Sequence, residues 1–397
     1  MTLPEIALST GTLSRQLSAR IEATVQQALE QQRLVGAVVL VARDGELVHR
    51  QAAGWADREK RLPMSVEAVF RLASVSKPIV STAALVLVAQ GRLGLDDSVE
   101  RWLPEFRPQL ADGRAARITV RHLLSHTAGL GYRFFEADAH GPYAQAGVSD
   151  GMDASTVSLT ENLSRIASVP LLYEPGTAWG YSVATDVLGA VIQRVQGEQL
   201  ADAVRQLVTD PLRMTDTGFA ALDPSRVPTA YVSATPEPHA LAEGEIVSPF
   251  EGAIGIPFSP ARIFNPQAFA SGGAGMAGTA EDFLRLLETL RRGGGELLST
   301  ALVEEMALDQ TGGRELPAAP GFGFGLGFSI LRDPALAVTP ESPGTWRWGG
   351  AYGHSWCVDR QQKLSVVAFT NTLYEGMSGR FVTDLRDAVY GVAELGQ

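Results

Sequence analysis

A serine and a lysine at positions 74 and 77 have the types and the spacing that nucleophilic catalysis requires. They lie in the segment FRLASVSKPIVSTAALVLVAQG (residues 70–91), whose long apolar run predicts a buried helix. Residues three apart share one helix face, so the hydroxyl of Ser74 and the amine of Lys77 can meet. A serine hydroxyl is a weak nucleophile that needs an adjacent base. The spacing therefore favours acyl transfer through Ser74, with Lys77 as the candidate base.

A lysine accepts a proton only when its amine is neutral. Desolvation at a helix start buried between two domains favours the neutral amine, and the helix dipole favours a negative charge on the serine oxygen. The simpler alternative is an exposed serine at the helix start beside a solvated lysine, because S-x-x-K is a common pattern. The two interpretations differ in whether Lys77 is buried.

A tyrosine supplies a second candidate proton carrier. The stretch EPGTAWGYSVATDVLG (residues 174–189) places Tyr181 at the start of another predicted helix. There its hydroxyl could relay a proton between the nucleophile and the leaving group. The alternative for a lone tyrosine is a role in the core.

The stretch TWRWGGAYGHSW (residues 345–356) predicts a strand with two consecutive glycines, Gly349 and Gly350. Glycine in a strand lets a ligand or another backbone approach closely. The N–H group of Ala351, which follows them, could join the N–H group of Ser74 as an oxyanion hole.

Another candidate serine, Ser149, lies in GVSDG (residues 147–151), which matches the pattern G-x-S-x-G. That motif needs a strained turn between a buried strand and a helix. Its flanks, EADAHGPYAQA and GMDAST, contain no short run of Val, Ile and Leu, so they predict a polar loop. A chance match in a chain with 41 glycines is the simpler interpretation, and the neighbouring Asp150 is expected to be a solvated surface charge. A Ser–His–Asp triad remains the rival mechanism for Ser149.

The histidines offer a second kind of site, which we consider and decline. His122 and His126 are spaced as in the zinc motif H-E-x-x-H, but Leu123 stands where the glutamate would be and no third ligand is evident. We therefore expect packed, hydrogen-bonded histidines and no metal. The other histidines, one of which a Ser–His–Asp triad would need, are His49, His140, His239 and His354.

The composition of the whole chain narrows the class of protein. It has 397 residues, of which 45% are hydrophobic, and this length suits two or three average domains or one large two-lobed enzyme. The net charge of −11 without a basic patch argues against nucleic acid as a partner. No signal peptide is visible at the start, and the apolar run at 79–89 is too short to span a bilayer, which argues against a membrane. The single cysteine, Cys357, excludes an internal disulfide, so we expect a cytoplasmic protein.

Elements of two kinds must position the candidate groups. Two β-rich runs around an Asp-Gly turn (residues 35–54) predict a hairpin, and residues 224–266 contain eight prolines without clear periodicity. Helical spacing is found at residues 12–33, 70–92, 158–169, 183–197, 278–294 and 378–393. Further strands are predicted for GFGFGLGFSI (321–330), WRWGG, HSWCVD and LSVVAFTN (364–371).

Strands thus lie near both ends of the sequence and helices fill the middle. We expect an α/β (α+β) fold with a mainly antiparallel sheet flanked by helices. Residues 1–70 and 270–397 would form the sheet domain. Residues 71–269 would form an inserted, mostly helical domain that contains the Pro-rich loop 224–266. The active site would lie between the two domains.

Together, the S-x-x-K, tyrosine and double-glycine stretches resemble the serine β-lactamase and penicillin-binding protein superfamily, whose marks are S-x-x-K, Y-x-N and K-T-G in that order. The segments RHLLSHTAGL (121–130), DPLRMTDTGF (210–219) and SGGAGMAGTAEDF (271–283) look like the same superfamily. The resemblance covers about residues 15–395. The nearest group is that of the family VIII carboxylesterases, which have the class C β-lactamase fold and often carry a non-catalytic G-x-S-x-G.

The resemblance implies a role for each matching position. Ser74 would be the acylated nucleophile, and Lys77 and Tyr181 would share the general-base and general-acid work. The N–H groups of Ser74 and Ala351 would hold the oxyanion.

Two positions depart from the superfamily pattern. Trp348 stands where K-T-G has its lysine, and Val183 stands where Y-x-N has its asparagine. In β-lactamases those two residues help to hold the carboxylate and amide groups of the lactam. Their loss favours neutral esters as substrates.

We therefore expect a serine carboxylesterase that hydrolyses short-chain carboxylic esters through an acyl-enzyme on Ser74, without a metal or a cofactor. Its only expected partner is the small-molecule ester, and the oligomeric state stays open. The rivals are a β-lactamase or D-amino-acid peptidase, an acyltransferase on the same fold, and a non-enzymatic acyl-binding module. The expected substrate contacts are Trp348, Gly349, Gly350 and Tyr132, with Phe134, Phe135 and part of 224–266 as further pocket walls.

Overall fold

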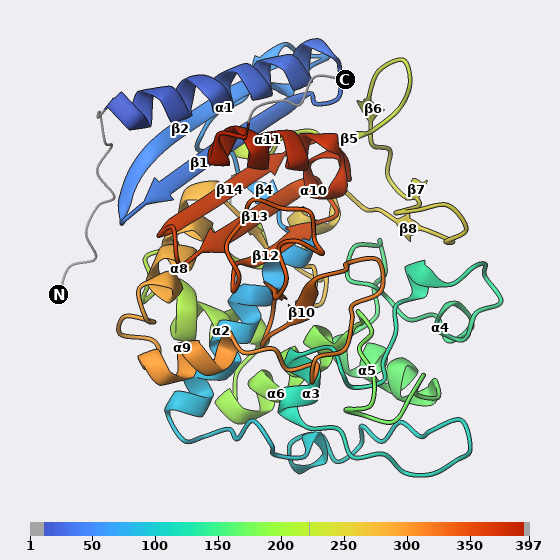
Figure 1. Cartoon of the computed structure of the whole chain (residues 1–397). Helices are drawn as coiled ribbons and strands as arrows, with labels where there is room; N and C mark the ends of the chain where they lie inside the picture. The colour runs from blue at the N-terminus through green and yellow to red at the C-terminus, as the bar shows by residue number, and fades with distance from the viewer. Residues whose placement is uncertain (1–11, 222, 393–397) are drawn as a thin grey trace.

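The computed structural model describes residues 12–221 and 223–392, and its centre is an eight-stranded sheet (Figure 1). The strand order is β10-β11-β12-β13-β14-β1-β2-β3, and every neighbouring pair is antiparallel, as predicted. The strands are β1 (Gly36–Arg43), β2 (Glu46–Asp57), β3 (Leu62–Pro63), β10 (Phe322–Phe324), β11 (Ser329–Leu331), β12 (Trp346–Gly350), β13 (His354–Asp359) and β14 (Leu364–Thr370).

The two ends of the chain meet in the middle of this sheet. β1 pairs with β14 from Ala37↔Thr370 to Arg43↔Leu364. The predicted hairpin of β1 and β2 is confirmed, and its turn has positive φ at Asp44 (54°) and Gly45 (88°), which suits the right-handed twist of the strands. The mainly antiparallel α/β architecture expected from the sequence is therefore confirmed.

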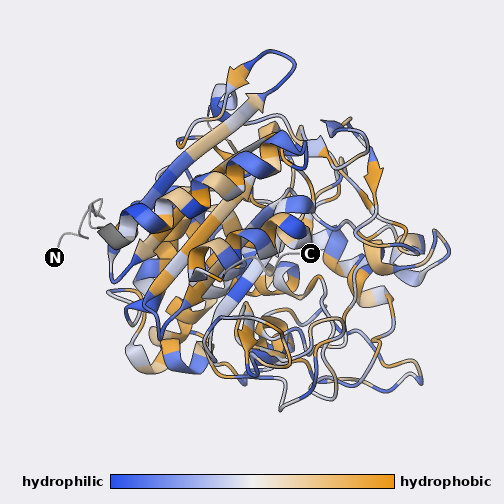
Figure 2. Cartoon of the chain, turned by 45° about the horizontal axis from the view of Figure 1, so that its top comes forward, coloured by the Kyte–Doolittle hydropathy of each residue, from blue (hydrophilic) through white to orange (hydrophobic). Residues whose placement is uncertain are grey.

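Helices cover both faces of the sheet, so its central strands are apolar on both sides. α1 (Thr12–Glu30) and α11 (Arg380–Tyr390) lie on one face, and α8 (Ala280–Arg291) packs against β1 and β14 on the other. Figure 2 shows orange and tan along much of the sheet, with blue stretches in some strands, whereas the helices in front of it alternate between orange and blue. This amphipathic pattern is the physical reason why the helical spacing could be read from the sequence.

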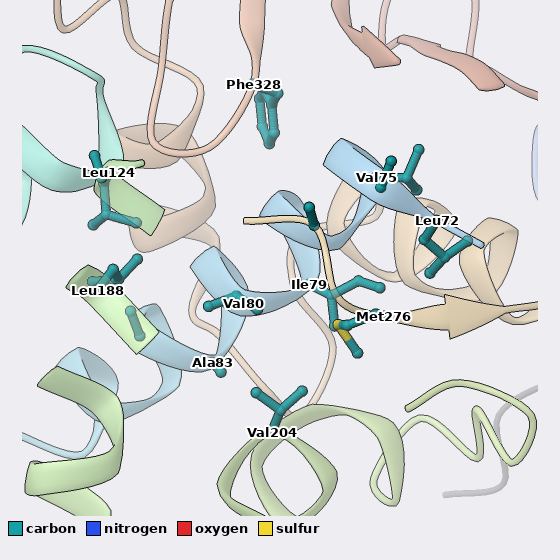
Figure 3. Close-up of a cluster of buried hydrophobic side chains, with 14 of the residues drawn as sticks. Leu72, Val75, Ile79, Val80, Ala83, Leu124, Leu188, Val204, Met276 and Phe328 are labelled. Carbon is teal, nitrogen blue, oxygen red and sulfur yellow. The ribbon is translucent and has the colours of Figure 1, made fainter. Parts of the chain in front are cut away.

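The middle of the chain forms mostly short helices around α2 (Ser76–Ala89). Nearly all of α2 is buried, and Val80 and Ala83 lie toward Leu188 and Val204 on neighbouring helices, whereas Ile79 lies beside Met276 (Figure 3). The remaining helices are α3 (Val120–Leu124), α4 (Pro142–Gln145), α5 (Leu159–Ser168), α6 (Ala184–Gln196), α7 (Leu200–Val204), α9 (Thr300–Met306) and α10 (Glu375–Ser378). A helix packed on all sides holds its first turn in one place, which matters for the residues described below.

One predicted element is wrong in its extent. The alternating segment 321–330 is not one strand but the hairpin of β10 and β11, closed by a hydrogen bond from the N–H of Gly325 to the carbonyl of Phe328. Gly327 has φ 114°, and a Cβ there would lie 2.5 Å from the hydroxyl of Ser81 in α2. The glycines that looked like one face of a strand therefore make the turn and its close approach to α2.

Residues 224–266 contain only two-residue strands and two three-residue 3-10 helices, η5 (Pro224–Arg226) and η6 (Arg262–Phe264), so the expected lack of long regular structure is confirmed. These strands are β5 (Tyr231–Val232), β6 (His239–Ala240), β7 (Ile246–Val247) and β8 (Ile256–Pro257). The division of the chain into two domains at residues 70 and 270 stays a prediction. In the described part of the chain, no helix combines the length and the apolar character that crossing a bilayer demands. The residues 1–11, on which the expectation about a signal peptide rests, lie outside the described ones.

Candidate active site

Ser74 lies at the junction between a tight turn and the buried helix. The predicted helix 70–92 begins only at Ser76, and Ser74 belongs to a 3-10 turn, η1 (Ala73–Val75), that leads directly into α2. Ala73, just before the serine, has φ 45°, a conformation that costs energy for a residue with a side chain. Upstream, β4 (Phe70–Arg71) pairs with β9 (Ala277–Gly278) and so anchors the turn from the other side.

Lys77 is completely buried in the first turn of α2, which excludes the solvated-lysine alternative. Its Nζ donates hydrogen bonds to the hydroxyl oxygen of Ser74 at 3.1 Å and to the carbonyl of Gly273 at 2.8 Å. The same nitrogen lies 4.6 Å from the ring centroid of Tyr181. The amine therefore touches the serine oxygen directly and is shielded from water.

Tyr181 approaches the same serine from the other side. Its hydroxyl donates to the Ser74 oxygen at 2.6 Å. The residue lies just before α6, as predicted, and its ring packs on His126, Tyr132 and Trp348 at centroid distances of 4.8, 5.1 and 5.0 Å. This packing aims the hydroxyl, so Ser74 contacts one nitrogen and one phenol oxygen that can each exchange a proton with it.

The end of β12 lies against the turn that carries Ser74. A Cβ placed on Gly350 would be 2.4 Å from the carbonyl oxygen of Leu72 and 3.2 Å from Val75, so only glycine permits this approach. Ala351 follows directly, is buried, and lines the same cavity as Ser74. The two backbone segments expected to form the oxyanion hole are therefore neighbours.

His354 at the start of β13 strengthens this junction. Its Nε2 donates to the carbonyl of Arg71 at 2.8 Å. Burial lowers the pKa of His354 to about 4, so the ring is neutral near pH 7. A neutral ring with a fixed tautomer holds the sheet and the Ser74 turn together.

A cavity of about 580 Å³ opens over Ser74, and its wall tests the expected substrate contacts. Trp348, Gly349, Phe134 and Phe135 line it, together with Pro249 and Ile256 from the Pro-rich segment. Residues on the wall that the sequence interpretation missed include Met152, Trp179, Tyr374 and Met377. Trp179 could have been found, because it stands two positions before Tyr181 in a polar stretch.

Two predicted contacts do not line the cavity. Tyr132 is buried behind Tyr181, where it stacks on Phe134 with ring centroids 4.4 Å apart and lies beside Lys77. Gly350 is buried because its α-carbon faces Leu72 and not the cavity. Both residues therefore shape the site from behind its wall.

A buried carboxylate that the sequence interpretation missed lies behind Lys77. Asp186 in α6 accepts hydrogen bonds from the hydroxyl of Ser271 at 2.6 Å and from the N–H of Gly273 at 3.4 Å. Burial raises the pKa of Asp186, while the hydrogen bond from Ser271 and the nearby Lys77 act in the opposite direction. The carboxylate thus holds the loop whose carbonyl at Gly273 receives the lysine.

Ser149 lies in a loop, as predicted, and away from the cavity wall. Its hydroxyl donates to Asp153 at 2.6 Å, and its backbone exchanges hydrogen bonds with the amide of Asn162 at 2.8 and 3.0 Å. The hydrogen-bond partner of its hydroxyl is thus a carboxylate, where the rival triad needs a histidine.

The expectation for Asp150 is wrong. Its side chain is not solvated but buried, with 1% of the residue exposed, and burial raises the pKa of its carboxyl well above the usual range. The loop 147–151 folds inward because it packs on the glycine-rich loop behind Lys77, where a Cβ on Gly151 would lie 2.1 Å from the hydroxyl of Ser271.

The two histidines of HLLSH are packed and hydrogen-bonded, as expected. Nδ1 of His122 accepts from the N–H of Thr119 at 3.3 Å, and Nδ1 of His126 accepts from the N–H of Ser182 at 3.2 Å. Burial lowers the pKa of both rings. Within residues 12–221 and 223–392, no group of three or more His, Cys, Asp or Glu side chains is arranged to hold a metal ion.

Comparison with known proteins agrees with this geometry. A family model described as Beta-lactamase matches residues 21–390. The chain is 51% identical to Esterase EstB of Burkholderia gladioli over 375 residues, which cover 94% of this chain and 95% of that protein. It is 27% identical to a Lovastatin esterase of Penicillium rubens over 92% of this chain and 96% of that one. The solved structure of EstCE1, a hydrolase with promiscuous acyltransferase activity, matches with a TM-score of 0.93 and 45% identity over 96% of this chain and 100% of that chain.

Proposed function

Because the chain belongs to the beta-lactamase family, we propose that Ser74, Lys77 and Tyr181 form the catalytic centre of a serine carboxylesterase that works through an acyl-enzyme. The chain is a carboxylic ester hydrolase that fits the family VIII carboxylesterases, as its likeness to Esterase EstB and EstCE1 supports. The observation that carries the assignment of residues is the convergence of the Lys77 amine and the Tyr181 hydroxyl on the Ser74 oxygen, at the wall of a cavity.

The geometry assigns a step to each group. Ser74 attacks the ester carbonyl while its proton passes to the Lys77–Tyr181 pair. The developing oxyanion is held by the N–H groups of Ser74 and Ala351. Tyr181 then protonates the departing alcohol oxygen, and a water molecule activated by the same pair releases the acyl group from the serine. No step in this sequence calls on a metal or a cofactor.

The walls of the cavity support a neutral substrate. Trp348 lines the cavity, whereas Val183, just before α6, is apolar, fully buried and not part of the wall. Neither residue offers the positive charge or the amide that a lactam carboxylate or side-chain amide would use. We propose short-chain carboxylic esters as the substrates and the cytoplasm as the location of the protein. The single cysteine, which excludes an internal disulfide, fits this location.

A direct test is to trap the acyl-enzyme. Brief mixing with p-nitrophenyl acetate and an acid quench should raise the mass of the protein by one acetyl group. Fragment analysis should place that group on the peptide that contains Ser74. Rapid ester hydrolysis with the label on another serine would overturn the assignment.

We expect esters to be cut far better than β-lactams. A charge-assisted contact contributes about 1.5–3 kcal/mol, so a site without the lysine and the asparagine should process a carboxylate-bearing lactam roughly 10–150-fold less well. A cephalosporin with an acetyl ester on its side chain offers both bonds in one molecule. Mass spectrometry should find deacetylation with an intact lactam ring. Ring opening with a kcat/KM comparable to that for a p-nitrophenyl ester would support the β-lactamase rival.

Gly350→Ala should lower kcat strongly without abolishing folding. The added methyl group would collide with the carbonyl of Leu72 and push Ala351 away from Ser74. A displacement of about 1 Å at reacting groups costs on the order of 100-fold in rate. Gly218→Ala is the control for an added methyl group elsewhere, because nothing lies within 4 Å of a Cβ there and its φ is not in the left-handed region. Unchanged ester hydrolysis in Gly350→Ala would remove the end of β12 from the catalytic centre.

A further inference from the structure

The cavity over Ser74 continues beyond the catalytic centre, along β12 to α11. The wall next to the serine includes Tyr181 and Trp348. The far part, which we call the helix arm, is lined by Leu316, Ala319, Ala337, Val382, Leu385 and Val389. The arm therefore lies between α11 and the two loops that precede β10 and follow β11, on the opposite face of the sheet from α2.

The helix arm has the chemistry of a site for an uncharged apolar chain. Its six defining residues are all aliphatic or small and apolar, and the polar residues that line the cavity from β11, β13 and α11, namely Ser329, Ser355, Thr383 and Tyr390, are uncharged. The two charged side chains at its edge are already paired: Arg347 with the fully buried Glu341 at 3.0 Å, and Arg386 with Asp387 at 2.8 Å. A bound anion would have to compete with these carboxylates, whereas a hydrocarbon chain would only replace water.

The arm also has an apolar rim. Ala337 is half-buried in its wall, and its neighbours Leu336 and Val338 are 51% and 81% exposed. Single exposed apolar residues are common on protein surfaces. Here two of them stand on either side of a residue that lines the arm, so the chain segment that borders the arm is apolar on its exposed side as well.

The position of the proton donor indicates which half of an ester reaches the arm. The carbonyl oxygen must face the N–H groups of Ser74 and Ala351, and the alcohol oxygen must face the hydroxyl of Tyr181. Tyr181 packs on Trp348, and from there the cavity passes Gly349, which has no side chain, to Arg347 and Ser355 on the other face of the sheet. The alcohol half therefore continues toward the helix arm, and the acyl half stays beside Ala351.

We propose that the helix arm is a binding site for the alcohol half of the substrate, and that the protein acts on short acyl esters of long, uncharged, apolar alcohols. This proposal rests on the proposed function, because it uses Ser74 and Tyr181 to orient the ester. The cavity volume of about 580 Å³ lies within the range of sites that bury drug-sized ligands and far exceeds what a short acyl group fills.

Two ester series separate the two halves of the substrate. One series consists of the acetates of ethanol, butanol, hexanol and octanol, and the other of the ethyl esters of acetic, butanoic, hexanoic and octanoic acid. Hydrolysis in a pH-stat should show kcat/KM rising about fourfold for each methylene added to the alcohol, which is the transfer free energy of a buried CH2 expressed as a rate ratio. The acyl series should be flat or fall.

Filling the arm should remove this selectivity while leaving the chemistry intact. Ala337→Phe and Val382→Phe add a ring from opposite walls. Each should lower the ratio of octyl acetate to ethyl acetate hydrolysis by about tenfold or more, the loss of roughly two buried methylenes. Because both esters are measured on the same variant, this ratio cancels any change in the catalytic groups themselves. Ala335→Phe is the matched control, because Ala335 is exposed in the same turn and does not line the cavity.

The outcomes distinguish failure of the arm from failure of the esterase assignment. If kcat/KM does not change with the length of the alcohol but p-nitrophenyl acetate is hydrolysed, the proposed binding site for the alcohol half is wrong and the esterase assignment stands. If kcat/KM rises steeply with the length of the acyl chain, the proposed orientation of the ester, with its alcohol half in the helix arm, is wrong. If the folded protein cuts no ester, the proposed function fails, and the arm is then tested by displacement of a fluorescent apolar probe with 1-octanol. Equal displacement from the parent and Val382→Phe overturns the arm.

Discussion

Ser74→Ala should lose about 10⁴-fold or more in kcat for p-nitrophenyl acetate, while its fold stays intact. The serine oxygen is the only atom that both the Lys77 amine and the Tyr181 hydroxyl contact in the described hydrogen bonds, so its removal leaves nothing to acylate. The serine is only half-buried and its side chain is small, so the change opens no large cavity. Steady-state hydrolysis at matched circular dichroism spectra measures the effect.

Ser149→Ala is the control that the chain itself provides. It changes the serine of G-x-S-x-G, whose hydroxyl bonds to Asp153 inside a buried loop. We expect most ester hydrolysis to remain, with a loss of stability of about 1–3 kcal/mol because Asp153 loses a buried hydrogen bond. Thermal melting measures the loss of stability, and steady-state ester hydrolysis measures the activity that remains. Full activity in Ser74→Ala together with loss in Ser149→Ala would revive the G-x-S-x-G mechanism.

Lys77→Arg should be nearly as damaging as Lys77→Ala, with kcat reduced by about 10²–10⁴-fold in both. Arginine keeps the positive charge but cannot give up its proton at neutral pH, so it cannot act as the base. If lysine served only as a positive charge near the serine, arginine would replace it in part. Ester hydrolysis between pH 7 and 8 compares the two variants.

Two further variants serve as controls for effects of the substitution that are unrelated to the base. Lys77→Met keeps the length of the buried chain and lacks both charge and base, so it should be as inactive as Lys77→Arg. Lys60→Arg changes an exposed lysine that pairs with Asp57, and it should leave ester hydrolysis unchanged. Robust hydrolysis by a folded Lys77→Arg would rule out lysine as the base and leave Tyr181 to accept the proton alone.

The local patterns of the sequence were enough to locate the groups that converge. The spacing of Ser74 and Lys77 places them within one helical turn, whether the serine lies in α2 or in the 3-10 turn before it, because both conformations bring residues three apart onto one side. The β1–β2 hairpin was predictable for the same reason, since Asp44 and Gly45 adopt the turn conformation by themselves.

Predictions from short-range patterns were wrong where one pattern is compatible with two local structures. Alternating glycine and phenylalanine in 321–330 suits a straight strand and a hairpin equally well, and the contact between Gly327 and Ser81 decides for the hairpin. The sequence predicts a solvated surface charge at Asp150, because aspartate is rarely buried. Its burial follows from the packing of Gly151 on Ser271, residues that are far apart along the chain.

The sequence by itself therefore determined the candidate catalytic groups, the antiparallel sheet and most of the long helices, because each depends on short-range patterns of residues. Only the tertiary structure decided what surrounds those groups: the Gly273 carbonyl and Asp186 behind Lys77, the exclusion of Tyr132 and Gly350 from the cavity wall, and the arm that leads to α11. The physical reason is that these surroundings combine segments from α2, α6, the loop at 271–273, β12 and α11. No local pattern encodes contacts between segments that the chain brings together only when it folds.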